Sequence, residues 1–205
     1  MLEPEFRGGY VFAYGSLVAS RDPLPTGDRL LEPVPGRLSG FRLVWGAAMA
    51  NRDAAPAKKH FVDPRTRRAP DVRIAFLDVE ESAGGTVQGL AIPVDAARLA
   101  VYDAREVNYF RIDVSAFFAP ALPLPVFAYR GTDEARERCQ VPPEDPPVCV
   151  SAGYLEAVRQ AFGELGPDSL AEFERTAMPT PFQVRPLDLV RPECADEQAA
   201  SRPAE

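Results

Sequence analysis

The chain has little of what most catalytic metal or thiol sites use. Its 205 residues include one histidine, His60, and three cysteines, Cys139, Cys149 and Cys194. An odd number of cysteines without a Cys-x-x-Cys spacing indicates neither a disulfide framework nor a zinc site. A single histidine excludes a histidine-rich metal site. We therefore expect no bound metal.

Long apolar runs and an excess of positive charge are also absent. No apolar run approaches the ~20 residues that cross a bilayer, and the first seven residues contain no apolar core of a secretory signal. The net charge of −7 argues against nucleic acid or an anionic membrane as the main partner. We expect a cytoplasmic protein with no membrane or nucleic-acid partner, while the sequence leaves the oligomeric state open.

The composition that remains is that of a globular protein. Apolar residues make up 46% of the chain, which includes 12 phenylalanines and 6 tyrosines. A chain of this length can bury a sizeable core as one domain. We expect a single domain over residues 1–191 and a flexible polar tail over 192–205, which has no apolar periodicity.

Apolar periodicity predicts six strands and three helices. The strands are expected at about 10–14, 37–46, 72–79, 86–93, 110–114 and 124–129. Gly84-Gly85 is expected to form a turn between the third and fourth of these strands. The helices are expected at about 95–106, 152–165 and 169–177, with Asp95 as the N-cap of the first.

A basic stretch at residues 52–70 stands out in this acidic chain. Its lysine, arginine and histidine residues are Arg52, Lys58, Lys59, His60, Arg65, Arg67 and Arg68. We interpret the stretch as a solvated loop. Its charge would also suit the attraction of an anionic substrate.

The first predicted strand ends abruptly in Tyr14-Gly15-Ser16-Leu17. Gly15 has no Cβ, so the backbone there can turn sharply, a ligand can approach it closely, and a positive φ is expected. Successive backbone N–H groups in such a turn can point at one anionic or carbonyl oxygen. The turn is therefore a candidate binding site, although the same pattern also suits a simple strand end.

Glu106 is the candidate catalytic residue. Leu99, Tyr102, Asp103 and Glu106 share one face of the helix predicted at 95–106, and the first two should turn that face inward. Glu106 would then lie at the helix C-terminus on the core side, where the helix dipole and burial both raise the pKa of a carboxylic acid. A raised pKa suits a general acid/base near neutral pH. The alternatives are an ion pair with Arg111, or a solvated pair of Asp103 and Glu106.

Taken together, these residues resemble the γ-glutamylcyclotransferase family. The resemblance rests on Tyr14-Gly15-Ser16-Leu17 after the first strand and on Asp103-Ala104-Arg105-Glu106 at the end of a helix. Further similarity lies in residues 36–42, 87–94 and 150–154, so the likeness spans about residues 10–165. Some relatives have Gly-Gly-Tyr after the glutamate, where this chain has Val107-Asn108-Tyr109.

The resemblance implies an α+β fold, a small closed mixed β-barrel flanked by helices. It also implies an intramolecular reaction, in which the α-amine of a γ-glutamyl group attacks the γ-carbonyl and releases 5-oxoproline and an amine. Glu106 would be the acid/base, and the backbone of Gly15, Ser16 and Leu17 would hold substrate oxygens. Tyr14 and Tyr154 would also contact the γ-glutamyl substrate. No metal or organic cofactor is implied.

Two other classes of function compete with this interpretation. A thiol enzyme would pair Cys139 or Cys149 with His60. A non-catalytic binding or assembly module could use the same barrel fold, but such a module needs no inward carboxylate at Glu106. The sequence does not distinguish a γ-glutamyl amino acid, a γ-glutamylamine or glutathione as the substrate.

Overall fold

The computed structural model describes residues 8–20, 22–26, 29–51, 59–140 and 145–191, so the expected tail at 192–205 lies outside the described residues. Its strands are β1 (Gly9–Ala13), β2 (Leu24–Thr26), β3 (Arg29–Leu31), β4 (Val34–Ala50), β5 (His60–Val62), β6 (Arg73–Val94), β7 (Tyr109–Asp113), β8 (Phe118–Ala119), β9 (Val126–Gly131), β10 (Val148–Ser151), β11 (Gln183–Arg185) and β12 (Asp188–Val190). Its α-helices are α1 (Ala96–Arg105), α2 (Asp133–Glu137), α3 (Ala152–Glu164) and α4 (Pro167–Ala177), and two short 3₁₀-helices are η1 (Ser16–Ala19) and η2 (Ser115–Phe117).

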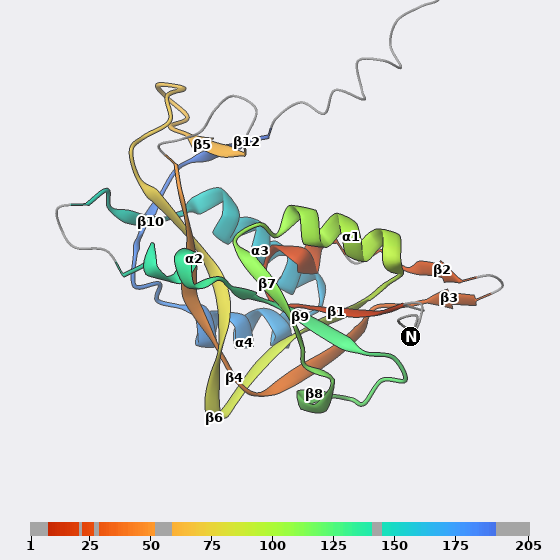
Figure 1. The fold of residues 1–205 in the computed structure, drawn as a ribbon. Coiled ribbons are helices and arrows are strands. Elements are labelled where there is room, and N and C mark those ends of the chain that lie inside the picture. The colour runs from red at the N-terminus through yellow and green to blue at the C-terminus, as the bar shows by residue number, and fades with distance from the viewer. Residues whose placement is uncertain (1–7, 21, 27–28, 52–58, 141–144, 192–205) are drawn as a thin grey trace, which may run out of the picture.

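The main sheet is mixed and curls into a half-barrel (Figure 1). Its strand order is β11-β10-β6-β1-β9-β7, and β4 pairs with both β6 and β8. β1 runs antiparallel to β6 and parallel to β9. The expected α+β class is confirmed. The expected closure is wrong, because among the described strands no pairing joins β7 back to the other end of the sheet.

The two strands predicted at 72–79 and 86–93 are one long strand, β6. It pairs with β4 from Val34 opposite Ala91 to Ala50 opposite Arg73. The register shifts next to Gly84-Gly85, where Ser39 lies opposite Thr86 and Phe41 opposite Glu81. The glycines therefore produce an irregularity inside a strand, because pairing with the distant β4 outweighs the local turn signal.

The three predicted helices are present, and local signals explain their bounds. The Asp95 side chain caps α1 by accepting the backbone N–H of Arg98 at 2.7 Å. Ser151 caps α3 in the same way through the N–H of Tyr154 at 3.3 Å. Gly166 separates α3 from α4, which begins at Pro167, and proline suits the first turn of a helix. No helix in the described part of the chain is long and apolar enough to cross a membrane.

The helices cover the sheet and enclose the core. α3 packs against η1 and α4, and α4 also contacts β4 and β6. α1 lies along the sheet near β7 and buries Leu99 and Tyr102 (Figure 1). The largest buried side chains include Phe12 from β1, Phe162 from α3 and Phe173 from α4. The rings of Phe162 and Phe173 stack with their centroids 4.9 Å apart, which joins the two helices to one core.

The basic stretch is not all loop. His60–Val62 forms strand β5, which pairs antiparallel with β12, so the prediction of a loop over 52–70 is wrong at these residues. Phe61 is buried in a small second core with Ile74 and Leu187. Arg52 and Lys58 lie outside the described residues.

Candidate active site

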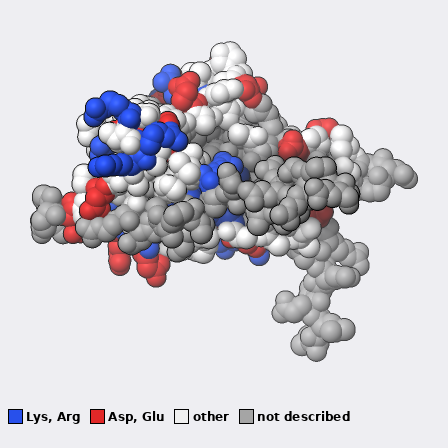
Figure 2. Space-filling model, turned by 90° about the horizontal axis from the view of Figure 1, so that it is seen from above, with Lys and Arg blue, Asp and Glu red and all other residues white. Residues whose placement is uncertain are grey.

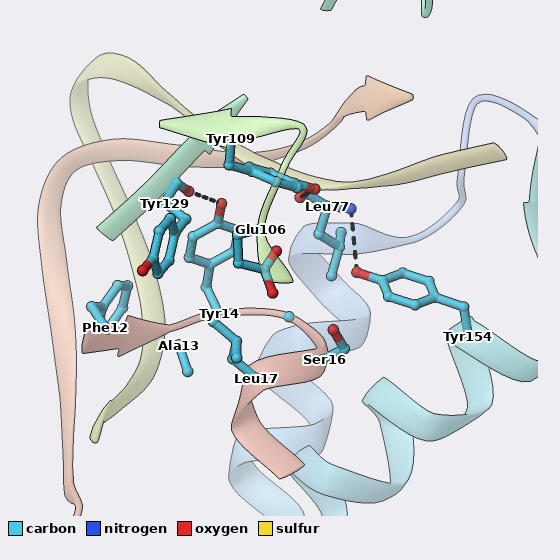
Figure 3. Close-up of a pocket in the computed structure, with 11 residues that line it drawn as sticks. Phe12, Ala13, Tyr14, Ser16, Leu17, Leu77, Glu106, Tyr109, Tyr129 and Tyr154 are labelled. Carbon is cyan, nitrogen blue, oxygen red and sulfur yellow. Dashed lines mark hydrogen bonds between the residues drawn. The ribbon is translucent and has the colours of Figure 1, made fainter. Parts of the chain in front are cut away.

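One small pocket forms where β1 ends and α1 ends. Its free volume is about 30 Å³, which is room for one or two water molecules. Figure 3 shows the Glu106 carboxylate in the middle of this group, with Tyr14 on one side and Tyr154 on the other. The lining residues are Phe12, Ala13, Tyr14, Gly15, Ser16, Leu17, Leu77, Glu106, Tyr109, Tyr129 and Tyr154. The pocket thus brings together all six residues that the sequence put forward as a site.

Glu106 is the only carboxylate in the pocket lining among the described residues. It is the C-cap of α1, with its backbone N–H donated to the Tyr102 carbonyl at 2.9 Å. Its side chain is 16% exposed, and the Arg105 Nε lies 3.2 Å from Oε1. Burial raises the pKa of Glu106, while Arg105 and Lys59 lower it by a smaller amount. The carboxyl group is therefore poised to take up and release a proton closer to neutral pH than an ordinary glutamate.

The expected alternatives for Glu106 do not form. Arg111 pairs with Asp103 instead, with Nη1 2.5 Å from Oδ2. Asp103 also accepts a hydrogen bond from the Tyr129 hydroxyl at 2.7 Å. Since Arg111 and Asp103 satisfy one another on the outer side of α1, neither restrains the Glu106 carboxylate.

Four tyrosines form most of the wall around Glu106. Tyr14 donates its hydroxyl hydrogen to the Tyr129 carbonyl, and Tyr109 donates to the Leu77 carbonyl at 2.8 Å. Burial is the largest cause of a raised pKa for the phenol groups of Tyr14, Tyr109, Tyr129 and Tyr154. The wall is therefore neutral at physiological pH, and it offers hydrogen-bonding hydroxyls rather than charge.

The Tyr154 hydroxyl lies where backbone donors converge. It accepts the N–H of Leu77 at 3.4 Å, and a hydrogen bond from the Ser16 backbone also acts on it. A Cβ added at Gly15 would be 3.2 Å from the same oxygen. An oxygen atom is thus already held at the turn that follows β1, by one backbone donor from β6 and one from the start of η1.

The expected reason for glycine at position 15 is wrong. Its φ is −138°, so the residue is not in the left-handed region. The turn instead leads directly into η1, in which Val18 donates its N–H to the Gly15 carbonyl at 3.0 Å. Close approach of the Tyr154 hydroxyl is what favours a residue without a Cβ.

The lining residues that the sequence did not put forward as a site are Phe12, Ala13, Leu77, Tyr109 and Tyr129. Tyr109 and Tyr129 lie in β7 and β9, where an aromatic residue reads equally well as core. The hydrogen bond between Tyr109 and Leu77 joins residues 32 positions apart. The sequence offered one signal for these residues, which is Tyr109 three positions after Glu106. A buried tyrosine hydroxyl needs a polar partner, so a tyrosine at this place indicates a polar site near Glu106.

A thiol site receives no support from the described residues. Cys149 is buried in β10, and Cys139 is half-buried after α2. Burial raises the pKa of both thiols, that of Cys139 to about 11, whereas a thiol nucleophile needs a lowered pKa. Neither cysteine lines the pocket with Glu106. Within the described ranges, no group of three or more histidine, cysteine or carboxylate residues is arranged to hold a metal ion.

Solved structures with the same architecture include a γ-glutamyl cyclotransferase. It superposes with a TM-score of 0.51 and 15% identity over 88% of this chain and 94% of its own. The YkqA protein of Bacillus subtilis superposes with a TM-score of 0.51 and 14% identity. The match covers 85% of this chain but only 56% of YkqA. An uncharacterised protein of Homo sapiens superposes with a TM-score of 0.50 and 16% identity, over 95% of this chain and 98% of its own.

At these identities the likeness defines the fold and nothing finer. The chain has the γ-glutamylcyclotransferase-like fold, in the form of a half-barrel. No protein-family model matches the sequence, and no curated protein matches it. The assignment of an activity therefore rests on the chemistry of the pocket.

Proposed function

We propose that this protein is a γ-glutamylcyclotransferase-type enzyme. Its substrate would be a small γ-glutamyl compound, and its products 5-oxoproline and the free amine, amino acid or peptide. The nucleophile is the α-amine of the substrate itself, so the protein needs no nucleophile of its own. The protein must hold the γ-carbonyl, remove a proton from the α-ammonium and supply one to the leaving nitrogen.

The observation that carries the proposal is the placement of Glu106. A buried carboxyl group with a raised pKa, beside donors that can hold a carbonyl oxygen, is what this reaction requires. Glu106 would accept the proton of the α-ammonium, because an ammonium has no lone pair with which to attack. The same group would then protonate the departing nitrogen as the C–N bond breaks.

The backbone around Gly15, Ser16 and Leu17 would hold the substrate oxygens. The pocket has room for only one or two waters, so a γ-glutamyl group requires a side chain to move. The Tyr154 hydroxyl already occupies the point where the Leu77 and Ser16 donors meet. We infer that a substrate oxygen takes that place and that the displaced hydroxyl hydrogen-bonds to the substrate.

A non-catalytic binding or assembly module is the second candidate. The small free volume of the pocket favours an assembly module, because a site for a small molecule is usually a larger preformed cavity. The placement of Glu106 favours the enzyme, since an inward carboxylate at a helix C-terminus is costly and a module gains nothing from it.

A panel of γ-glutamyl compounds separates the two candidates. The panel comprises a γ-glutamyl amino acid, a γ-glutamylamine and glutathione, and 5-oxoproline is measured by mass spectrometry. We expect release from at least one of them with the purified protein, and unchanged release after treatment with EDTA. Binding of these compounds without any 5-oxoproline would overturn the enzyme and support the module.

A further inference from the structure

Two basic side chains from distant parts of the chain lie beside Glu106. Arg105 reaches across the turn that follows β1. Its Nη2 and Nη1 lie 3.4 Å from the hydroxyls of Ser16 and Ser20, and its Nε lies 3.2 Å from Glu106. Ser16 and Glu106 both line the pocket, so the guanidinium lies at its entrance. The 3.4 Å contacts are long for hydrogen bonds, and the side chain is 40% exposed.

Lys59 is connected to the pocket through Phe76, which packs against the lining residue Tyr154. Its Nζ lies over the Phe76 ring, 4.9 Å from the centroid. Phe76 in turn packs edge-on against Tyr154, with centroids 5.0 Å apart. This cation–π contact places the ammonium one ring away from Tyr154, the tyrosine whose hydroxyl contacts the turn donors.

Among the charged groups that act on Lys59, cations outnumber carboxylates. The groups that act on Lys59 are the Glu106 carboxylate and two further cations, Arg105 and Arg191. Arg105 and Lys59 both act on the Glu106 carboxylate, in a protein with a net charge of −7. Seen from the side of α1, β5 and β12, Lys and Arg gather in one group near the edge and another near the middle of the face (Figure 2). A local positive field of this kind attracts and orients anions.

We propose that Lys59 and Arg105 form a subsite for a carboxylate carried by the group that the reaction releases. This inference rests on the proposed function and narrows its substrate to γ-glutamyl amino acids or peptides, rather than γ-glutamylamines. With the γ-glutamyl end bound beside Glu106 after Tyr154 has moved, the departing group lies at the entrance of this small pocket. In an α-amino acid the carboxylate is one carbon away from the departing nitrogen, which places it within reach of both cations.

The geometry suits a carboxylate in two ways. A guanidinium offers two parallel N–H groups to one carboxylate, and Arg105 would exchange two long contacts with serine hydroxyls for them. Lys59 is exposed, and its ammonium lies over the Phe76 ring, so one side of it is shielded from water while the other is open to an anion.

A matched pair of substrates tests the inference. γ-Glutamyl-alanine carries the carboxylate, and γ-glutamyl-alaninamide replaces it with a neutral group of nearly the same shape. We expect the wild-type protein to have a KM about tenfold lower for the acid than for the amide. The Lys59→Met variant should lose about that factor for the acid and change by less than about twofold for the amide. Arg65→Met, which removes another exposed basic side chain of the same stretch, should leave both KM values unchanged.

The comparison of the two substrates separates binding from effects on the acid/base. Removing Lys59 also removes a cation that lowers the pKa of Glu106, but that change acts on both substrates alike. An equal loss for acid and amide, or an equal KM for both in the wild type, overturns the carboxylate subsite and leaves the proposed function standing. Release of 5-oxoproline from neither compound, nor from the wider panel, overturns the proposed function and the subsite with it.

Discussion

Asp78 and Glu106 are two buried carboxylates in very different surroundings. Asp78 in β6 is fully buried. Its Oδ1 accepts the backbone N–H groups of Gly131 and Val79 at 2.8 and 2.7 Å, and its Oδ2 lies 2.6 Å from Arg136 Nη2 in an ion pair without a hydrogen bond. Glu106 has one cation at 3.2 Å, which is shared with two serine hydroxyls, and its carboxylate lines a pocket.

The difference separates a structural carboxylate from a chemically available one. Asp78 joins β6 to β9 through Gly131 and to α2 through Arg136, and even a Cβ at Gly131 would come within 2.8 Å of its Oδ2. The Asp78 side chain is 0% exposed and does not line the pocket with Glu106, so no ligand reaches it to exchange a proton. Burial with few donors leaves Glu106 with a raised pKa and free lone pairs, and a proton-transfer group needs both.

Breaking the Asp78 set of contacts should give the largest stability loss. Asp78→Asn leaves Arg136 facing an amide in a buried site, and removing one partner of a buried ion pair costs about 3–5 kcal/mol. Urea unfolding measures this loss. Glu81→Gln is the matched control, because its carboxylate is 74% exposed opposite Arg130 and should contribute less than about 1 kcal/mol. A loss below about 1 kcal/mol for Asp78→Asn would show that the buried pair does not stabilise the fold.

Crowding the floor of the Glu106 pocket should have the next largest effect. The added side chain in Gly15→Val meets the Tyr154 hydroxyl, so we expect a loss of about 1–3 kcal/mol and a raised KM. A second variant, Gly15→Val with Tyr154→Phe, removes the oxygen in the way and should recover part of the stability. Normal stability and normal KM in the single variant would show that this turn is not the binding site.

The stability of Glu106→Gln relative to the wild type should increase as the pH rises. Burial raises the pKa of Glu106 in the folded protein, so the protonated form of this residue contributes to the stability of the wild type at low pH. This contribution is lost as the pH rises from the ordinary value of 4.5 through the raised folded-state pKa. The variant should therefore gain relative to the wild type across that window, by about 1.4 kcal/mol for each unit of pKa difference. The free energy of unfolding, measured from pH 4 to 8, tests this prediction. A variant that becomes less stable relative to the wild type as the pH rises would show that the folded-state pKa of Glu106 is not raised.

Removing the cation beside Glu106 should have the smallest effect on stability. Arg105 is 40% exposed, so we expect Arg105→Gln to cost less than about 1 kcal/mol. Arg136→Gln, which unpairs the buried Asp78, should cost several times more. Equal losses for the two arginines would remove the distinction between the two carboxylates.

The sequence predicts what short-range signals control. The cap at Asp95 and the apolar face of α1 place Glu106 at a helix end on the core side, and the structure confirms both. Gly84-Gly85 misleads because pairing with β4, more than 40 residues away in the chain at Ser39, decides the local conformation. The contact of Tyr154 with Leu77 spans 77 residues, so no local pattern contains it. Closure of a barrel depends on whether the edge strands of the sheet pair with one another. The family resemblance led us to expect a closed barrel, whereas the described strands form an open half-barrel.

The most direct test of the acid/base role is kcat for 5-oxoproline release by Glu106→Gln. The amide keeps nearly the same shape, so the variant should fold with unchanged or slightly higher stability and bind substrate almost as well. It cannot take the proton of the α-ammonium, and we expect kcat to fall by about 10²–10⁴-fold. A folded Glu106→Gln protein that retains the wild-type kcat would contradict the role of Glu106 and the mechanism that depends on it.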